Sequence, residues 1–179
     1  MKKFKLFCMT AVLTAVFSLP ALAAIYYGNY ATVAGTNTFA GKVFISDGQK
    51  MKTETMQYQM ITRGDKKLSW VLRPIENIYT VSPISLNSSA IVSMKVIGEI
   101  GRKKVGSELV TTVECEKYLV TCKIGKKNVN MYQWISADYP FPLKAATIDG
   151  TWSIELSQLE VVTNLTDSIF EIPAGFRKE

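Results

Sequence analysis

The sequence predicts a mainly β protein built from antiparallel strands, with little helix. From Phe39 onward, short runs of alternating polar and apolar residues follow one another, and no long stretch has a helical period. Turn-forming dipeptides such as Asp47-Gly48 and Asp149-Gly150 separate neighbouring runs. Consecutive runs joined by tight turns are typical of an antiparallel meander.

The first 23 residues have the pattern of a secretory signal peptide. Three lysines within the first five residues precede an apolar run over 6–19 and the small-residue pattern Ala21-Leu22-Ala23. We expect cleavage after Ala23, which leaves residues 24–179 as one periplasmic domain without a transmembrane segment. The alternative is a retained membrane anchor, because residues 6–24 carry no charge.

Composition excludes several functions. The chain has no histidine, so Ser-His-Asp catalysis, Cys-His catalysis and histidine metal ligands are excluded. Without the three leader lysines, 18 basic side chains face 15 acidic ones, a weak excess that does not indicate nucleic-acid binding. No nucleophile stands beside an activating base, so we expect neither an enzyme nor a cofactor.

The strands can be placed in chain order from these runs and the turns between them. The expected strands are Lys42–Ser46, Lys50–Tyr58, Lys66–Arg73, Ile75–Ser82, Gly98–Val113, Glu116–Ile124, Asn128–Ser136, Leu143–Ile148 and Thr151–Val162. The uncharged stretch Ala24–Asn37 is either a first strand or a lid. One short helix is expected at Ser85–Met94, where serines can cap the apolar run that follows.

Alternation assigns side chains to faces. Trp152, Ile154 and Leu156 are apolar and alternate with polar residues, so one face of their strand is buried. The same spacing of two residues places Leu68, Trp70 and Leu72 on one face of another strand. It also places Tyr118 and the apolar residues that alternate with it on one face of a third strand. We expect these sets to share one apolar interior, which a lid, a second layer or a ligand must cover.

Cys115 and Cys122 remain after signal cleavage. An oxidising compartment favours pairing them. On one continuous strand, however, they would lie about 23 Å apart and on opposite faces, too far for a disulfide. Unpaired, Cys122 is expected in the core and Cys115 partly exposed.

Five short motifs in the second half of the chain occur together in a fixed order. They are VGSELV at Val105–Val110, CEKYLV at Cys115–Val120, the Trp134-Ile135-Ser136 strand end, FPLKA at Phe141–Ala145 and FEIPAGF at Phe170–Phe176. With them, the chain resembles a family of secreted bacterial proteins in the outer-membrane lipoprotein carrier (LolA/LolB-like) superfamily. The segment Ile61–Pro74 resembles the central hairpin of that family.

The resemblance implies a strongly curved antiparallel sheet, an incomplete β-barrel, whose concave apolar face is closed by a helical lid. Classical carriers have several helical segments in this lid, whereas here only Ser85–Met94 and the stretch Ala24–Asn37 are available. The implied function is the binding of an acyl chain, a lipid or a lipoprotein.

Two functional hypotheses follow. The first is a periplasmic binding protein that holds a hydrophobic ligand in the concave face, as a lipoprotein carrier does. The candidate contacts are Leu68, Trp70, Leu72, Tyr118, Trp134, Trp152, Ile154 and Leu156. The same residues could instead fill a closed core. The second hypothesis is a module that binds or senses an envelope protein without a lipid, with Ala24–Tyr30 as its contact surface.

Overall fold

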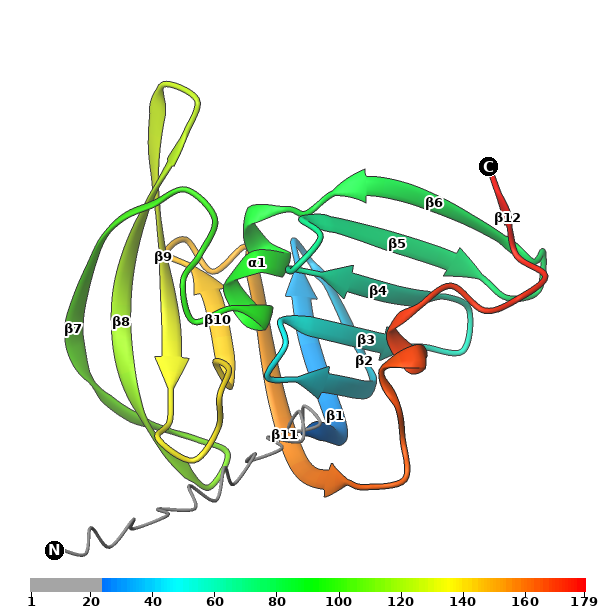
Figure 1. The fold of residues 1–179 in the computed structure, drawn as a ribbon. Helices are drawn as coiled ribbons and strands as arrows, with labels where there is room; N and C mark the ends of the chain where they lie inside the picture. Colours follow the sequence, from blue (N-terminus) through cyan, green and yellow to red (C-terminus); the bar gives the residue numbers. More distant parts are fainter. Residues whose placement is uncertain (1–23) are drawn as a thin grey trace, which may run out of the picture.

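The computed structural model describes residues 24–179, whose strands all belong to one twelve-stranded sheet (Figure 1). The predicted signal peptide, residues 1–23, lies outside the described residues. The strands are β1 (Ile25–Ala34), β2 (Asn37–Ser46), β3 (Lys50–Glu54), β4 (Gln59–Arg63), β5 (Leu68–Arg73), β6 (Ile78–Pro83), β7 (Glu99–Val110), β8 (Val113–Ile124), β9 (Lys127–Ile135), β10 (Lys144–Thr147), β11 (Trp152–Val162) and β12 (Arg177–Lys178).

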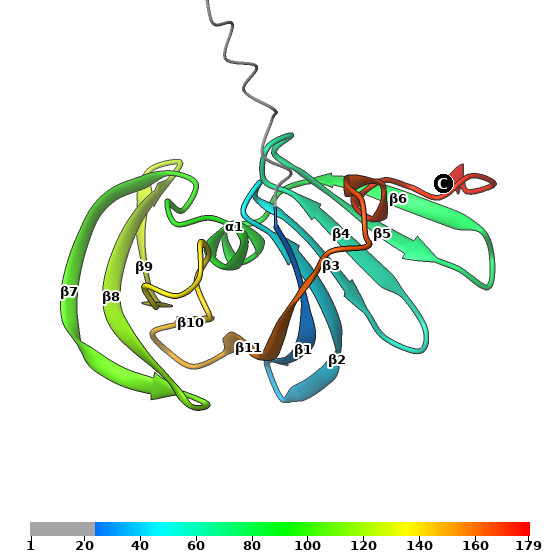
Figure 2. The same ribbon diagram turned by 60° about the horizontal axis from the view of Figure 1, so that its bottom comes forward.

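The sheet is open and mainly antiparallel, as the sequence predicts. Its order is β12-β6-β5-β4-β3-β2-β1-β11-β10-β9-β8-β7, and β12 and β7 are its two outer strands. The short β12 pairs with β6 in parallel, whereas the other neighbouring strands run antiparallel. Figure 2 shows the strong curvature that carries β7 to β10 around one side of the molecule.

A short helix, α1 (Leu86–Val92), lies against the curved sheet (Figure 2). It confirms the predicted helix. Ser85 is its N-cap, and the Ser85 hydroxyl accepts a hydrogen bond from the Ser88 amide at 3.0 Å. A 3₁₀ turn, η1 (Asp167–Phe170), follows later. Among residues 24–179, no helix has the length and apolar character needed to cross a membrane.

The uncharged N-terminal stretch is a central strand and not a lid. Its residues form β1, which pairs with β2 on one side and β11 on the other. Both backbone edges of Ala24–Tyr30 are therefore occupied over most of its length. The expectation that this stretch is a free contact surface is wrong, because the sheet itself uses its hydrogen-bonding groups.

Two turns without a glycine or proline shift strand boundaries from the expected ones. The predicted run Lys50–Tyr58 is interrupted after β3, where the Thr55 hydroxyl accepts hydrogen bonds from the amides of Gln57 and Tyr58 at 3.3 and 3.1 Å. The chain then reverses into β4, which the alternating runs did not predict, although the resemblance places a hairpin at Ile61–Pro74. The turn between β7 and β8 falls at Thr111, whose φ is 57°, earlier than expected.

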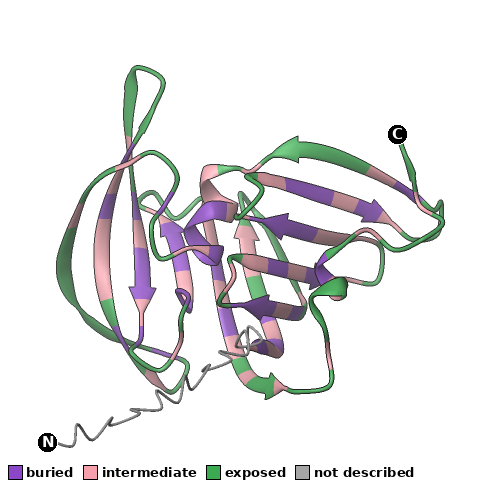
Figure 3. Ribbon diagram, viewed as in Figure 1, coloured by how far each residue is buried: buried purple, intermediate pink, exposed green. Residues whose placement is uncertain are grey.

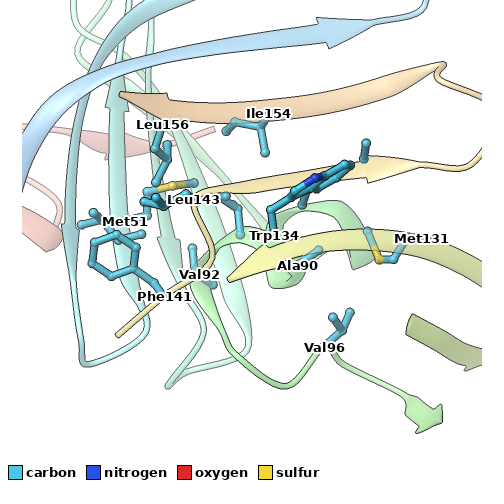
Figure 4. Packing of buried hydrophobic residues seen from close by; sticks show 14 of the residues in the cluster. Met51, Ala90, Val92, Val96, Met131, Trp134, Phe141, Leu143, Ile154 and Leu156 are labelled. Atoms are coloured by element: carbon cyan, nitrogen blue, oxygen red, sulfur yellow. The ribbon is translucent and has the colours of Figure 1, made fainter. Parts of the chain in front are cut away.

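Buried residues occur in both halves of the sheet (Figure 3), and they form two apolar clusters. The larger cluster contains Ala90, Ile91 and Val92 of α1, and Figure 4 shows Ala90 and Val92 near residues of β9 and β11. The second cluster contains Ile61, Trp70, Leu72 and Phe170.

The two clusters lie on opposite faces of the sheet near β4 and β5. Ile61 belongs to the second cluster, whereas its strand neighbours point to the other face because side chains alternate along a strand. The prediction of one interior shared by all the apolar sets is therefore wrong. Leu68, Trp70 and Leu72 lie in the second cluster, while Trp152, Ile154 and Leu156 lie in or against the larger one.

Both described cysteines lie on β8 and are free. The continuous strand keeps them apart, as the spacing argument predicts. Cys115 and Cys122 are 1% and 0% exposed. The expectation of a partly exposed Cys115 is thus wrong, and burial raises the pKa of both thiols.

Candidate functional site

A cavity of about 310 Å³ lies between α1 and the strands β1, β3, β4 and β11. We call it the α1 cavity. Its lining residues are Tyr30, Thr32, Ala34, Phe39, Met51, Thr53, Tyr58, Met60, Ser85, Asn87, Ser88, Ile91, Trp152 and Ile154. No side chain in this set is charged. The volume is at the lower end of the range of roughly 300–1,000 Å³ that is typical of ligand pockets.

Strand alternation explains how the sheet side of the cavity is built. Met51 and Thr53 are two residues apart on β3 and therefore point to the same face. Tyr30 and Thr32 do the same on β1, and Trp152 and Ile154 on β11. The register places Thr32 opposite Ile154, which brings the two strands' lining residues together.

A polar network holds the C-terminal end of α1 against the sheet. The Gln133 side chain is fully buried, and its amide donates hydrogen bonds to the carbonyls of Ala90 at 2.6 Å and Ser93 at 3.1 Å. The Arg102 guanidinium donates to Gln133 Oε1 at 2.7 Å and to the Glu99 carboxylate at 2.9 Å. These bonds satisfy carbonyls at the helix end and fix the position of α1 over the cavity.

The opposite end of α1 contributes to the cavity wall. Ser85, Asn87 and Ser88 line the cavity there. Their short polar side chains offer hydroxyl and amide groups to a ligand without introducing a charge. The cavity therefore combines an apolar interior with polar groups at one wall.

Four more hydroxyl groups lie on the sheet side, those of Tyr30, Thr32, Thr53 and Tyr58. Burial raises the pKa of Tyr30, and the neighbouring Tyr58 adds to this effect, whereas a hydrogen bond with Thr53 opposes it. The Tyr30 hydroxyl is therefore neutral at pH 7 and can donate or accept a hydrogen bond. This environment suits an apolar chain that carries an uncharged polar group.

Two of the eight predicted contact residues, Trp152 and Ile154, line the α1 cavity. Leu156 lies in the same apolar cluster and lines a separate hollow beside the β7–β8 turn, together with Val110 and Leu143. The period of two on β11 thus identified the correct face, but the cavity covers only one end of the strand.

Trp134 and Tyr118 do not line the cavity. The Nζ atoms of Lys117 and Lys144 lie 4.9 and 5.3 Å from the Trp134 ring centroid, and the Trp134 indole donates to Glu108 at 2.8 Å. The Arg102 guanidinium lies 5.3 Å from the Tyr118 ring centroid. Both rings are engaged with cations, a structural role that alternation alone could not reveal.

Leu68, Trp70 and Leu72 contact the C-terminal segment. Phe170 of η1 is fully buried in their cluster, with Leu165, Ile169, Ile172 and Phe176 against it. An ion cluster fixes this segment: Arg63, only 5% exposed, pairs with Asp65 at 2.6 Å and with Glu171. The chain's own C-terminal residues occupy the surface that these three side chains form.

Sequence reasoning missed most of the sheet side of the cavity. Tyr30, Met51 and Met60 were not among the candidates. For Met51 and Thr53 a signal existed, because they alternate with Lys50, Lys52 and Glu54. No comparable signal marked Met60, since the turn before β4 was not recognised.

Within residues 24–179, no group of three or more His, Cys, Asp or Glu side chains is arranged to hold a metal ion.

No family model matches the chain, and no curated protein matches it. Several solved structures do match the chain. They include MucB in complex with MucA, at 10% identity and a TM-score of 0.48, covering 85% of this chain and 55% of that one. A putative outer-membrane lipoprotein-sorting domain from Vibrio parahaemolyticus matches at 10% identity and a TM-score of 0.35, with 83% and 89% covered.

The Mycobacterium tuberculosis lipoprotein LppX matches at 15% identity and a TM-score of 0.39, covering 80% of this chain and 90% of that one. The chain spans only about half of the MucB complex chain. All three TM-scores are below 0.5.

Proposed function

We propose that this chain is a periplasmic binding protein that holds a single apolar chain, such as the acyl chain of a lipid or lipoprotein, in the α1 cavity. The observation that carries the proposal is an uncharged cavity of about 310 Å³ against the sheet. Each methylene group buried there contributes about 0.8 kcal/mol. The periplasmic location rests on the leader pattern of residues 1–23.

The cavity favours binding over catalysis. Its polar groups are hydroxyls and one amide, and neither a carboxylate nor an amine lines it. Such groups orient a ligand but do not supply a general base near neutral pH. The volume suits one chain better than the several chains of a triacylated lipoprotein.

A cavity-filling substitution tests the proposal. Met60→Trp adds bulk at the cavity wall, whereas Val81→Trp adds the same ring on the opposite face, because the exposed Val81 pairs with Trp70 of the second cluster. We expect residues 24–179 to bind a fluorescent fatty-acid probe, Met60→Trp to weaken binding at least about tenfold, and Val81→Trp to bind like wild type. Equal binding by Met60→Trp and wild type would contradict the proposal.

A second candidate function is the binding of an envelope protein along the outer edge of β7. This edge strand has twelve residues, and Ile100, Val105 and Leu109 are exposed on it. An open edge can accept a partner strand. Two register irregularities, after Glu99 and after Lys104, interrupt the edge and restrict its pairing. If the Met60→Trp variant, in which the cavity is filled, still binds an envelope protein, that result would favour this candidate.

A further inference from the structure

One end of the sheet presents exposed lysines and isoleucines side by side. The β8–β9 turn carries Lys123, Ile124, Lys126 and Lys127, all of them exposed. The preceding segment 95–100 adds exposed Lys95, Ile97 and Ile100. A hydrogen bond of 2.8 Å from the Lys123 amide to the Gly98 carbonyl joins the two segments. We call these seven residues the lysine–isoleucine end.

The charge of this end is uniformly positive. Between Lys117 and Ala137 the sequence has no Asp or Glu. The nearest carboxylate in the other segment, Glu99, is bound by Arg102. Among the described residues, the four lysines of this end form none of the ion pairs. Their charges are therefore available to an external anion.

The shape of this end suits a flat partner. Figure 1 shows the β8–β9 hairpin projecting beyond the rest of the sheet, and Figure 3 shows that its tip is exposed. Ile124 and Lys127 form the last register pair before the turn, so an apolar side chain stands among the lysines near the tip. A projecting tip can reach a planar surface without interference from the rest of the molecule.

We propose that the lysine–isoleucine end docks on the anionic headgroups of a phospholipid bilayer. Lysines near such a surface are attracted by its negative potential, and their long stems let the ammonium groups reach the headgroups. The isoleucines would enter the boundary between headgroups and acyl chains. This apolar component distinguishes a bilayer from a nucleic acid, which basic proteins contact mainly through phosphates. The proposal does not depend on the α1 cavity.

Vesicle co-sedimentation of residues 24–179, which contain the whole described fold, tests the docking. The probes are vesicles of phosphatidylglycerol mixed with phosphatidylcholine, and vesicles of phosphatidylcholine alone. We expect binding only to the anionic vesicles, with affinity falling as salt is added. Since each lysine at such a surface contributes about fivefold, K126E/K127E should weaken binding at least about 25-fold.

A matched control changes the same charge elsewhere. Arg177 and Lys178 are exposed on β12, at the opposite end of the sheet order, so R177E/K178E should bind like wild type. Ile124→Ser should weaken binding several-fold without altering its salt dependence. Urea unfolding checks that each variant is folded.

Three results would overturn the proposal. The first is an equal loss in the two charge-reversal variants, which would reflect net charge alone. The second is equal binding to vesicles with and without phosphatidylglycerol, or to neither. The third is binding to double-stranded DNA that depends on Lys126 and Lys127 in the absence of vesicle binding.

Discussion

At the residue scale, Gln133 links the helix to the sheet. Its side-chain amide reaches two carbonyls of the α1 region, and its oxygen accepts from Arg102. All three contacts are made by a fully buried group. A buried polar residue with every group bonded specifies one position of the helix, because any displacement leaves donors or acceptors unpaired.

We therefore expect Gln133→Leu to lower the free energy of unfolding by about 2–4 kcal/mol, since it leaves the carbonyls of Ala90 and Ser93 without donors. Tyr132→Phe, the next residue on β9, is the control and should change stability by less than about 0.5 kcal/mol. Urea unfolding measures both. A Gln133→Leu variant as stable as Tyr132→Phe would mean that the network does not hold α1.

At the element scale, the docking of α1 and its following loop onto β7 depends on an ionised Glu99. Burial raises the pKa of this carboxyl, but hydrogen bonds from Arg102 and from the Val96 amide outweigh burial and leave the pKa lowered. A lowered folded-state pKa contributes stability above the unfolded-state pKa, which is near 4.5. That contribution is lost as the pH falls through the folded-state value.

The free energy of unfolding of the wild type should therefore fall more steeply below about pH 4.5 than that of Glu99→Gln. At pH 7, Glu99→Gln should be the less stable protein, because its neutral amide pairs less strongly with Arg102. Glu114→Gln, at an exposed position outside the described ion pairs, is the control and should follow the wild-type curve. Parallel curves for wild type and Glu99→Gln would exclude this role.

Period-two runs and glycine turns predicted most of the strands. The turns at Gly125 and Gly150 fall as expected, with φ of 60° and 71°. The hairpin after Ser46 also forms, but its positive φ lies at Gln49 and not in Asp47-Gly48. The β3–β4 turn depends on the Thr55 hydroxyl and the β7–β8 turn on Thr111, so the local composition gave no signal for either.

The same limit applies to the candidate site. Alternation predicted that Trp152 and Ile154 face inward, and both line the cavity. It also grouped Trp70 with them, although Trp70 lies on the opposite face. Periodicity shows which side chains of a strand are buried. Where both faces of a curved sheet are covered, it cannot show on which of the two faces those side chains lie.

At the scale of the whole molecule, β3 and β4 carry side chains toward two different apolar surroundings. Met51 and Met60 line the α1 cavity on one face, whereas Ile61 packs on the other face with the C-terminal segment, where Phe170 is fully buried. Arg63 fixes this segment by pairing with Glu171, and a hydrogen bond from the same guanidinium lowers the pKa of Asp65. The α1 cavity and the C-terminal segment lie on different faces, so stability and ligand binding can be separated by experiment.

Phe170→Ala should lower the free energy of unfolding by about 3–5 kcal/mol, because it removes a fully buried ring from the second cluster. Fatty-acid-probe affinity, measured where the variant is still folded, should remain that of the wild type, since the α1 cavity lies on the opposite face of β4. Met60→Trp should show the reverse pattern, with lost binding and a smaller change in stability. If Phe170→Ala weakened probe binding as strongly as Met60→Trp, the two faces would be coupled, and the C-terminal segment would have to be counted as part of the binding site.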